Sequence, residues 1–249
     1  MKMSQKINIA LFSSFVVTAV SGAFIWGSDF LLNQSVPWHM QSGIDEDSLS
    51  TYGVNEYRLL DRRPVIAQIN KNQKKQVLIL VDSWGVSHDK SVLEKEFSIF
   101  NDIPHDFAIH HRMANRTKHA ERVEYRRDSS DALFLFGGDS LEFGRSEYMQ
   151  EIGYSRRLFF QKCSDSLMLA KLDSVMSDGA FSTIAWTTQG SRYGSEDSLM
   201  STLKGIHSLA KEYPDVRFVV QGTHRPILCN PEYKRTFYEH WVPVVVLNP

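Results

Sequence analysis

The segment that decides the fold is Val77-Leu-Ile-Leu-Val-Asp-Ser-Trp-Gly-Val86. Its first five residues are all apolar, and such an uninterrupted run is typical of a strand that is buried on both faces of a parallel sheet. The run ends on a carboxylate, Asp82. Open α/β sheets bind their ligands at the carboxyl ends of their strands, so this aspartate is a candidate site residue. An equally simple interpretation is that Asp82 caps the loop or the helix that follows.

Length and composition fit one α/β domain of ordinary size with an additional N-terminal segment. The chain has 249 residues, of which 42% are hydrophobic and 12% are aromatic, and this is enough for a sizeable core. The formal net charge of −1 gives no support for a nucleic-acid partner. Cys163 and Cys229 match no metal-binding spacing and form no disulfide framework. We expect two free thiols, with a single bridge as the alternative.

The N-terminal segment has the features of a membrane anchor. Ile7 to Trp26 contains no charged residue, and Lys2 and Lys6 precede it. A helix of about 20 such residues crosses a bilayer, and flanking lysines favour the cytoplasmic side. We expect residues 1–27 to be an uncleaved anchor, with a cleaved signal peptide or a buried core helix as the alternatives. In both membrane cases the rest of the chain lies outside the cytoplasm.

The pattern after the N-terminal segment predicts an α/β domain over residues 75–249. Residues 28–74 show little periodicity and are interpreted as a solvated connector. Apolar runs then alternate with helical spacings, which predicts a doubly wound, mainly parallel sheet with helices on both faces. The expected strands are 77–81, 107–110, 132–136, 180–188, 216–220 and 242–247, and the expected helices are 90–100, 164–177 and 196–213. The charged stretch 110–131 is expected to form a solvated helix with ion pairs.

Polar clusters also follow the fourth and fifth expected strands, at residues 187–192 and at Gln221-Gly-Thr-His-Arg225. A carboxylate and an imidazole together suit a divalent metal such as zinc. Guanidinium groups match the oxygens of a phosphate-like anion. A threonine hydroxyl is a poor nucleophile unless a metal or a base activates it. His224 considered alone is explained more simply as a loop histidine with satisfied hydrogen bonds.

Several blocks of the sequence resemble the alkaline phosphatase superfamily. They are Val77–Gly85, Phe134–Asp139, Phe181–Ser191, Phe218-Val-Val-Gln-Gly-Thr-His-Arg-Pro226 and Trp241–Pro249. The most similar branch is the sulfatase-like, membrane-anchored phosphoethanolamine and phosphoglycerol transferases, including lipoteichoic acid synthases. The resemblance implies a transferase or hydrolase of phosphate or sulfate esters that uses zinc or manganese. Its substrate would be a membrane lipid or envelope glycan in the periplasm or outside the cell.

The resemblance also implies roles for individual residues. Asp82 stands at the position of the strand-end metal ligand, and His224 at that of a later ligand. Thr117, in Asn115-Arg-Thr-Lys-His-Ala-Glu121, matches the covalent nucleophile, which also contacts the metal. Thr223 takes the place of an aspartate ligand, and Arg192 that of a catalytic histidine. A neutral threonine binds a dication more weakly than a carboxylate does.

The two departures leave the activity open. Arg192 and Arg225 are expected to bind the anionic part of a substrate, but an arginine does not act as an acid or base near neutral pH. One expectation is an active enzyme with a weakened metal site. The other is a catalytically inactive sulfatase-like module in a cell-envelope assembly, with a membrane-protein partner.

A third interpretation comes from Gly138-Asp-Ser-Leu141, which matches the signature of GDSL-type esterases with Ser140 as the nucleophile. Such an esterase needs an aspartate three residues before its catalytic histidine. Gln221 occupies that position before His224, so half of the pair is absent.

Overall fold

A computed structural model of the chain describes residue 49 and residues 57–69, 75–112, 114–126, 132–138, 149–154, 156–161, 163–189 and 196–249. The predicted N-terminal anchor, Arg192, and Asp139 and Ser140 of the GDSL-like motif lie outside these ranges. Within them, no helix combines the length and the apolar character that a bilayer-spanning segment requires. Cys163 and Cys229 are free thiols, as expected.

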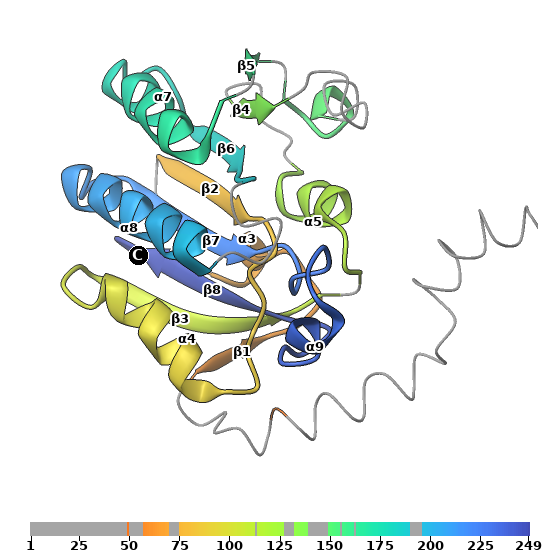
Figure 1. Ribbon diagram of the computed structural model, residues 1–249. Helices are drawn as coiled ribbons and strands as arrows, with labels where there is room; N and C mark the ends of the chain where they lie inside the picture. The colour runs from red at the N-terminus through yellow and green to blue at the C-terminus, as the bar shows by residue number, and fades with distance from the viewer. Residues whose placement is uncertain are drawn as a thin grey trace, which may run out of the picture. The chain divides into compact units, whose positions relative to one another are not determined.

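The fold is built on one mixed, mostly parallel sheet of eight strands (Figure 1). The strands are β1 (Arg58–Leu60), β2 (Gln76–Val81), β3 (His105–His111), β4 (Ala132–Gly138), β5 (Arg156–Gln161), β6 (Thr183–Thr187), β7 (Arg217–Gly222) and β8 (Trp241–Leu247). Their order in the sheet is β1-β3-β8-β7-β2-β6-β4-β5. Strand β8 runs antiparallel to β3 and β7, and the other pairs in this sheet are parallel.

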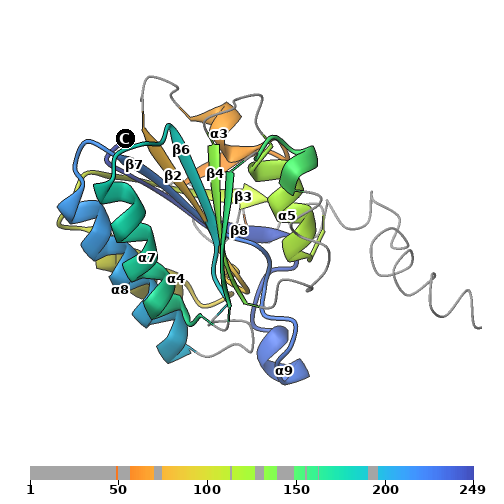
Figure 2. The ribbon, with the colours of Figure 1, turned by 90° about the horizontal axis from the view of Figure 1, so that it is seen from above.

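Helices cover both faces of the sheet, as Figure 2 shows. One face carries α4 (Lys90–Phe97), which continues into the 3-10 turn η1 (Ser98–Phe100), together with α7 (Asp165–Ser177) and α8 (Glu196–Glu212). The other face carries α3 (Val65–Gln68) and α5 (Thr117–Glu124), and the short α9 (Pro231–Lys234) lies near one end of the strands. The predicted α/β class is therefore confirmed.

Strand β2 lies in the middle of the sheet and has apolar side chains on both faces. Val77, Ile79 and Val81 pack in the core under α4, α7 and α8. Leu78 and Leu80 pack in the core on the opposite face. This one strand therefore contributes to the core on both faces of the sheet. Full burial of each such side chain contributes about 1.5–3 kcal/mol. The interpretation of the run as a doubly buried strand is confirmed.

Side-chain caps set the starts of two predicted helices. Asp89 precedes α4, and its carboxylate accepts a hydrogen bond from the Ser91 N–H at 3.0 Å. Ser164 precedes α7, and its hydroxyl accepts one from the Leu167 N–H at 3.4 Å. Such caps satisfy backbone donors that have no partner in the first turn of a helix.

The sequence patterns did not reveal β5, α9 and the structure in two further stretches. Residues 57–69, in the predicted connector, contribute β1, which pairs with β3 at the edge of the sheet, and α3. In the charged stretch 110–131, α5 is short, and Arg112, Glu121 and Glu124 are buried rather than solvated. The expected helix and an ion pair are therefore present, but the expectation that the charged side chains are solvated was wrong for these three. Charged side chains tolerate burial only when partners compensate them, and the Arg112–Glu124 contact described below is such a compensation.

Candidate functional site

The ends of β2 and β7 lie side by side because the two strands pair in parallel, with Val81 opposite Gly222. The residues that follow these strands therefore emerge at the same edge of the sheet. Asp82 follows β2, and Thr223 and His224 follow β7. The N–H of Thr223 donates to the Val81 carbonyl at 3.0 Å and extends the pairing by one residue.

Helix α5 adds Thr117, its first residue, to this edge. The Thr117 hydroxyl donates to Asp82 Oδ1 at 2.6 Å and lies 3.2 Å from His224 Nε2. The Thr223 hydroxyl donates to the same Asp82 oxygen at 3.1 Å, and His224 Nε2 is 3.5 Å from it. Four side chains that were singled out at distant positions in the sequence therefore lie within hydrogen-bonding reach of one another.

The backbone after Asp82 turns sharply and is held by two hydroxyls. Ser83 has a φ of 59°, a left-handed conformation that is uncommon for residues other than glycine. Its N–H donates to the Thr223 hydroxyl, and the Asp82 N–H donates to the Thr188 hydroxyl, both at 3.1 Å. Thr223 thus has a structural role in the turn as well as its contact with the Asp82 carboxylate.

The hydrogen bonds of His224 define which ring nitrogen faces Thr117. His224 Nδ1 is 2.7 Å from the Arg225 carbonyl oxygen. A carbonyl only accepts, so Nδ1 carries the proton and the neutral ring has its lone pair on Nε2. The Thr117 hydroxyl therefore lies between a carboxylate and an imidazole lone pair, either of which can accept its proton. A hydroxyl beside such a base has the arrangement of an activated nucleophile.

The donor set does not fit a tightly bound zinc or manganese ion. In the described part of the chain, no three histidine, cysteine, aspartate or glutamate side chains lie close enough together to hold a metal. Asp82 and His224 supply two such groups, and Thr117 and Thr223 supply neutral hydroxyls that both donate to one Asp82 oxygen. Protein zinc sites normally have at least three nitrogen, sulfur or carboxylate ligands.

The structure describes only one of the two arginines that were predicted to bind an anion. The Arg225 guanidinium lies 2.9 Å from Glu239 Oε1 and 3.4 Å from the Phe237 carbonyl oxygen, to which it donates. The positive charge of Arg225 is therefore already paired with the Glu239 carboxylate. Arg192 lies outside the described residues, and so does the nucleophile position of the GDSL-like motif, Ser140. The roles of these residues stay predictions.

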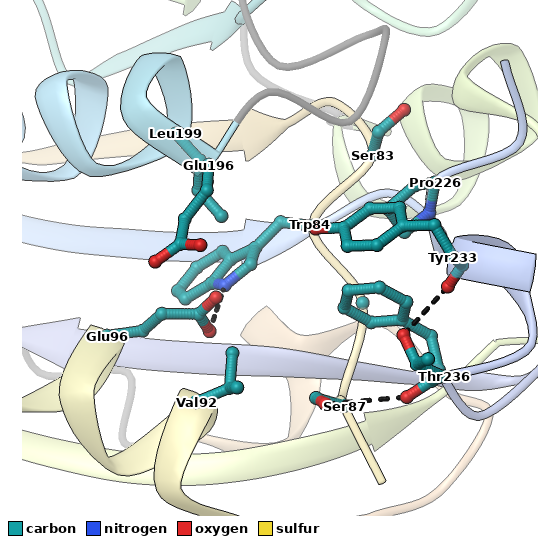
Figure 3. A pocket seen from close by; sticks show the side chains of 12 residues that line it. Ser83, Trp84, Ser87, Val92, Glu96, Glu196, Leu199, Pro226, Tyr233 and Thr236 are labelled. Atoms are coloured by element: carbon teal, nitrogen blue, oxygen red, sulfur yellow. Dashed lines mark hydrogen bonds between the residues drawn. The ribbon is translucent and has the colours of Figure 1, made fainter. Parts of the chain in front are cut away.

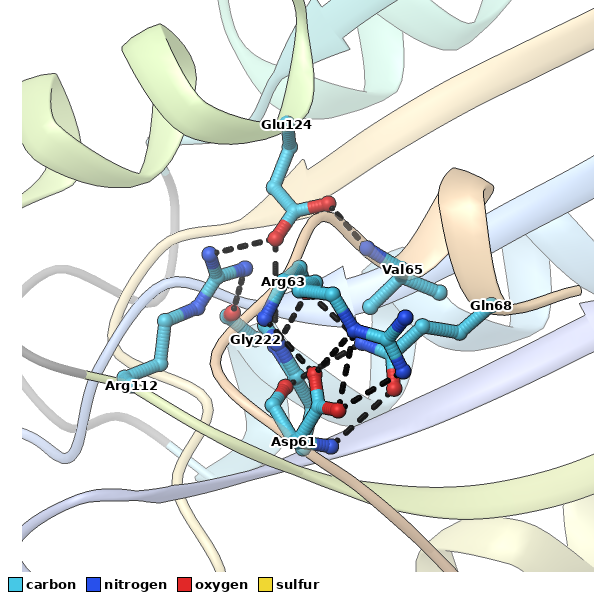
Figure 4. Close-up of polar contacts among 8 residues, drawn as sticks. Asp61, Arg63, Val65, Gln68, Arg112, Glu124 and Gly222 are labelled. Carbon is cyan, nitrogen blue, oxygen red and sulfur yellow. Dashed lines mark hydrogen bonds and ion pairs between the residues drawn. The ribbon is translucent and has the colours of Figure 1, made fainter.

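A buried ion pair beneath the cluster was missed by the sequence predictions (Figure 4). Arg112 Nη1 donates to Glu124 Oε1 at 2.8 Å, and Arg112 Nη2 donates to the Gly222 carbonyl oxygen at 3.1 Å. The second Glu124 oxygen accepts the Val65 N–H at 2.8 Å. Arg112 thereby links α5, which begins with Thr117, to the end of β7. The available signal was weak, because Arg112 directly follows a strand that itself contains polar residues, His105-Asp-Phe-Ala-Ile-His-His111.

Comparison with solved structures agrees with the predicted resemblance at the level of the fold. The chain is similar to a protein in the alkaline phosphatase superfamily from Vibrio parahaemolyticus, with a TM-score of 0.52 and 12% identity over 72% of this chain and 61% of that chain. It also matches the lipoteichoic acid synthase LtaP from Listeria monocytogenes, with a TM-score of 0.49 and 9% identity over 70% of this chain and 65% of that chain. This chain therefore covers less than two thirds of either protein.

A further match is the C-terminal periplasmic domain of EptC from Escherichia coli in complex with zinc, with a TM-score of 0.47 and 10% identity over 71% of this chain and 73% of that chain. No family model matches the sequence, and a search of curated proteins finds no match. The α/β fold of this chain is thus similar to that of a solved protein in the alkaline phosphatase superfamily.

Proposed function

We propose that this chain is a sulfatase-like transferase or hydrolase that acts on phosphate or sulfate esters of an envelope lipid or glycan, with Thr117 as its nucleophile. The observation that carries the proposal is the position of the Thr117 hydroxyl, 2.6 Å from the Asp82 carboxylate and 3.2 Å from His224 Nε2. The fold supports it, because the cluster lies at the carboxyl ends of parallel strands, where open α/β sheets place their sites. In this proposal residues 1–27 anchor the domain to a membrane, and the domain lies outside the cytoplasm.

The proposed reaction has two steps that exchange one ester bond for another. Thr117 Oγ attacks phosphorus or sulfur, its proton moves to His224 Nε2, and the bond to the ester oxygen breaks. The leaving alkoxide takes a proton from solvent. Water or an acceptor hydroxyl then attacks the Thr117 ester and loses its proton to solvent, while Thr117 Oγ recovers its proton from His224. Backbone N–H groups in the first turn of α5 and the predicted contact from Arg192 oppose the negative charge of the transferred group.

Replacing Thr117 with alanine tests the nucleophile. We expect Thr117→Ala to lower turnover of bis(p-nitrophenyl) phosphate or p-nitrophenyl sulfate at least about 1,000-fold, because loss of a nucleophile removes the covalent step. Thr117→Ser keeps a hydroxyl at the same place and is the matched control, with turnover well above that of the alanine variant. Equal turnover by the folded wild-type and Thr117→Ala proteins would contradict the assignment.

The second candidate function is a catalytically inactive module of the same fold in a cell-envelope assembly. The observation that favours it is Thr223, which occupies a position expected to hold a metal-binding carboxylate and instead donates to Asp82. A membrane-protein partner belongs to this alternative. It predicts that neither wild type nor Thr117→Ser turns over any ester, with or without added zinc or manganese.

Thr223→Asp tests whether the missing carboxylate limits metal binding. A second carboxylate beside Asp82 is unfavourable without a cation, because like charges at this distance repel. We therefore expect the variant to unfold at a lower temperature than wild type in chelator, and zinc to restore its stability. Its zinc affinity, measured by calorimetry, should exceed that of wild type by roughly tenfold or more. Thr223→Asn has a similar shape without the charge and should gain no affinity. A Thr223→Asp protein that binds zinc no better than wild type contradicts this expectation.

A further inference from the structure

A small pocket lies beside the polar cluster, on the face of the sheet that α4 and α8 cover (Figure 3). Its lining includes Ser83 and Gly85, which follow Asp82 in the sequence, and Pro226, which lies two residues after His224. Its volume is about 90 Å³, whereas a single water molecule needs about 10–15 Å³ by the same measure. The pocket therefore has room for a small organic group.

Aromatic rings and carboxylates line this pocket together. The rings belong to Trp84, Tyr233 and Phe237, and the carboxylates belong to Glu96 and Glu196. Figure 3 shows both carboxylates close to the Trp84 indole, with the Tyr233 ring pointing toward them from α9. Ring faces and carboxylates both attract positive charge, so the lining favours a cationic ligand.

Glu96 is a buried carboxyl group that forms no ion pair within 4 Å in the described part of the chain. Its side chain is only 4% exposed, and it accepts a hydrogen bond from the Trp84 indole N–H at 2.8 Å. The neighbouring Lys95 pairs with Glu196 instead, at 2.7 Å. Burial raises the pKa of Glu96 to about 7, because the ionised carboxylate loses its hydration in the pocket. Lys95 offsets this effect only in part, and a cation bound at Glu96 would form the direct ion pair.

We propose that this pocket binds an alkylammonium ion, with the charged nitrogen at Glu96 and the attached methyl or methylene groups against Trp84 and Tyr233. Glu196 contributes a second negative charge at the pocket. The attraction of Glu196 for a cation is weakened, because its side chain is 56% exposed and paired with Lys95. Cation binding in this pocket does not require turnover at Thr117, so an inactive Thr117 would leave the proposal unaffected.

Choline is a suitable probe, because 3,3-dimethyl-1-butanol has the same shape without the charge. We expect calorimetry on the purified full-length chain at pH 8 to show choline binding, and the neutral analogue to bind at least tenfold more weakly. Phosphocholine distinguishes two sources of the cation. It binds more tightly than choline if the ammonium group is part of an ester substrate, and no more tightly if the ligand is a free amine.

Two glutamates of α4 provide a matched pair of variants. Glu96→Gln keeps an oxygen that accepts the Trp84 N–H but removes the charge, and we expect it to weaken choline binding at least tenfold. Glu94 lies on the same helix and pairs with Lys90 at 3.3 Å outside the pocket, so Glu94→Gln should bind as wild type does. Tyr233 is 38% exposed, so Tyr233→Leu removes one ring without disturbing the core and should weaken binding severalfold. This surface variant keeps the proposal testable if Glu96→Gln fails to fold.

The affinity for choline should also depend on pH through Glu96. The ionisable groups around it are Lys95 on α4, Glu196 on α8 and Tyr233 on α9. Burial and the two glutamates raise the pKa of Tyr233 above its usual value, so the phenol stays neutral. With a Glu96 pKa of about 7, we expect affinity to increase about tenfold between pH 6 and pH 8, and to stay constant in Glu96→Gln. The proposal is overturned if choline does not bind at pH 8, or if wild type and Glu96→Gln bind it equally.

Discussion

Gly222→Ala is expected to destabilise the domain by about 3 kcal/mol or more, or to prevent folding, because this site has no room for a methyl group. A Cβ built on Gly222 would lie 1.8 Å from the Trp84 carbonyl oxygen and 3.1 Å from the Val242 Cβ. The closest atom belongs to the backbone, so no side-chain rotation can relieve the clash. Strand β7 would have to move away from the segment after β2. The four side chains that meet between these two segments would then separate.

Urea unfolding followed by circular dichroism measures this effect, and Gly205→Ala is a matched control. Gly205 lies inside α8, and a Cβ there would meet Leu169 Cδ1 at 2.3 Å. That atom is the end of a flexible side chain, and alanine also favours a helix over glycine by about 1 kcal/mol. The control should therefore remain within about 1 kcal/mol of wild type. Similar stabilities for the two variants would show that the close approach at Gly222 does not constrain the fold.

Arg112→Met is expected to cost about 3–5 kcal/mol, since it leaves the Glu124 carboxylate buried without its partner. Both side chains are 2% exposed, so water cannot replace the lost interaction. The variant also removes the hydrogen bond to the Gly222 carbonyl oxygen. The link between α5 and the end of β7 is lost, and with it the support for the distance between Thr117 and His224.

A double variant separates the cost of an unpaired charge from the cost of lost packing. Arg112→Met combined with Glu124→Gln removes both charges, while the glutamine oxygen still accepts the Val65 N–H. We expect the double variant to recover much of the stability that the single variant loses, because neutral replacements of a buried pair are tolerated. Lys95→Met is the control, since it breaks the exposed pair with Glu196 and should change the stability far less than Arg112→Met, because exposed ion pairs contribute little. Equal losses from Arg112→Met and Lys95→Met would contradict the prediction.

The fold was predictable where a sequence pattern has a single physical explanation. The run 77–81 has no polar residue, so a strand buried on both faces was the simplest interpretation, and the structure confirms it. The amphipathic spacings that end near Ser177 and Glu212 likewise predicted α7 and α8. Strand β1 has only three residues, too few to establish a pattern. Strand β5 has exposed Leu158 and Phe159, so its apolar residues do not mark one buried face.

The candidate site was predictable only in part, because charged residues look alike in a sequence whether they are exposed or buried. Asp82, Thr117 and His224 were found through strand ends and a family resemblance, and the structure brings them together. The buried state of Glu96 depends on Trp84, and no local pattern reports such a contact. Arg112 similarly depends on Gly222, far along the chain. The burial of such charged residues can be recognised only when the positions of the strands in the sheet are known.

The position of β8 has a consequence for how this protein matures during synthesis. Strand β8, which follows all other strands of the described sheet in the sequence, is hydrogen-bonded between β3 and β7. The ribosome therefore releases β1 and β3 long before the strand that attaches them to the rest of the sheet. Pairings between such distant segments form slowly, and exposed strand edges are prone to aggregation in the meantime. Until residue 247 has emerged, β3 and β7 lack the strand that pairs with both of them, so the sheet is incomplete.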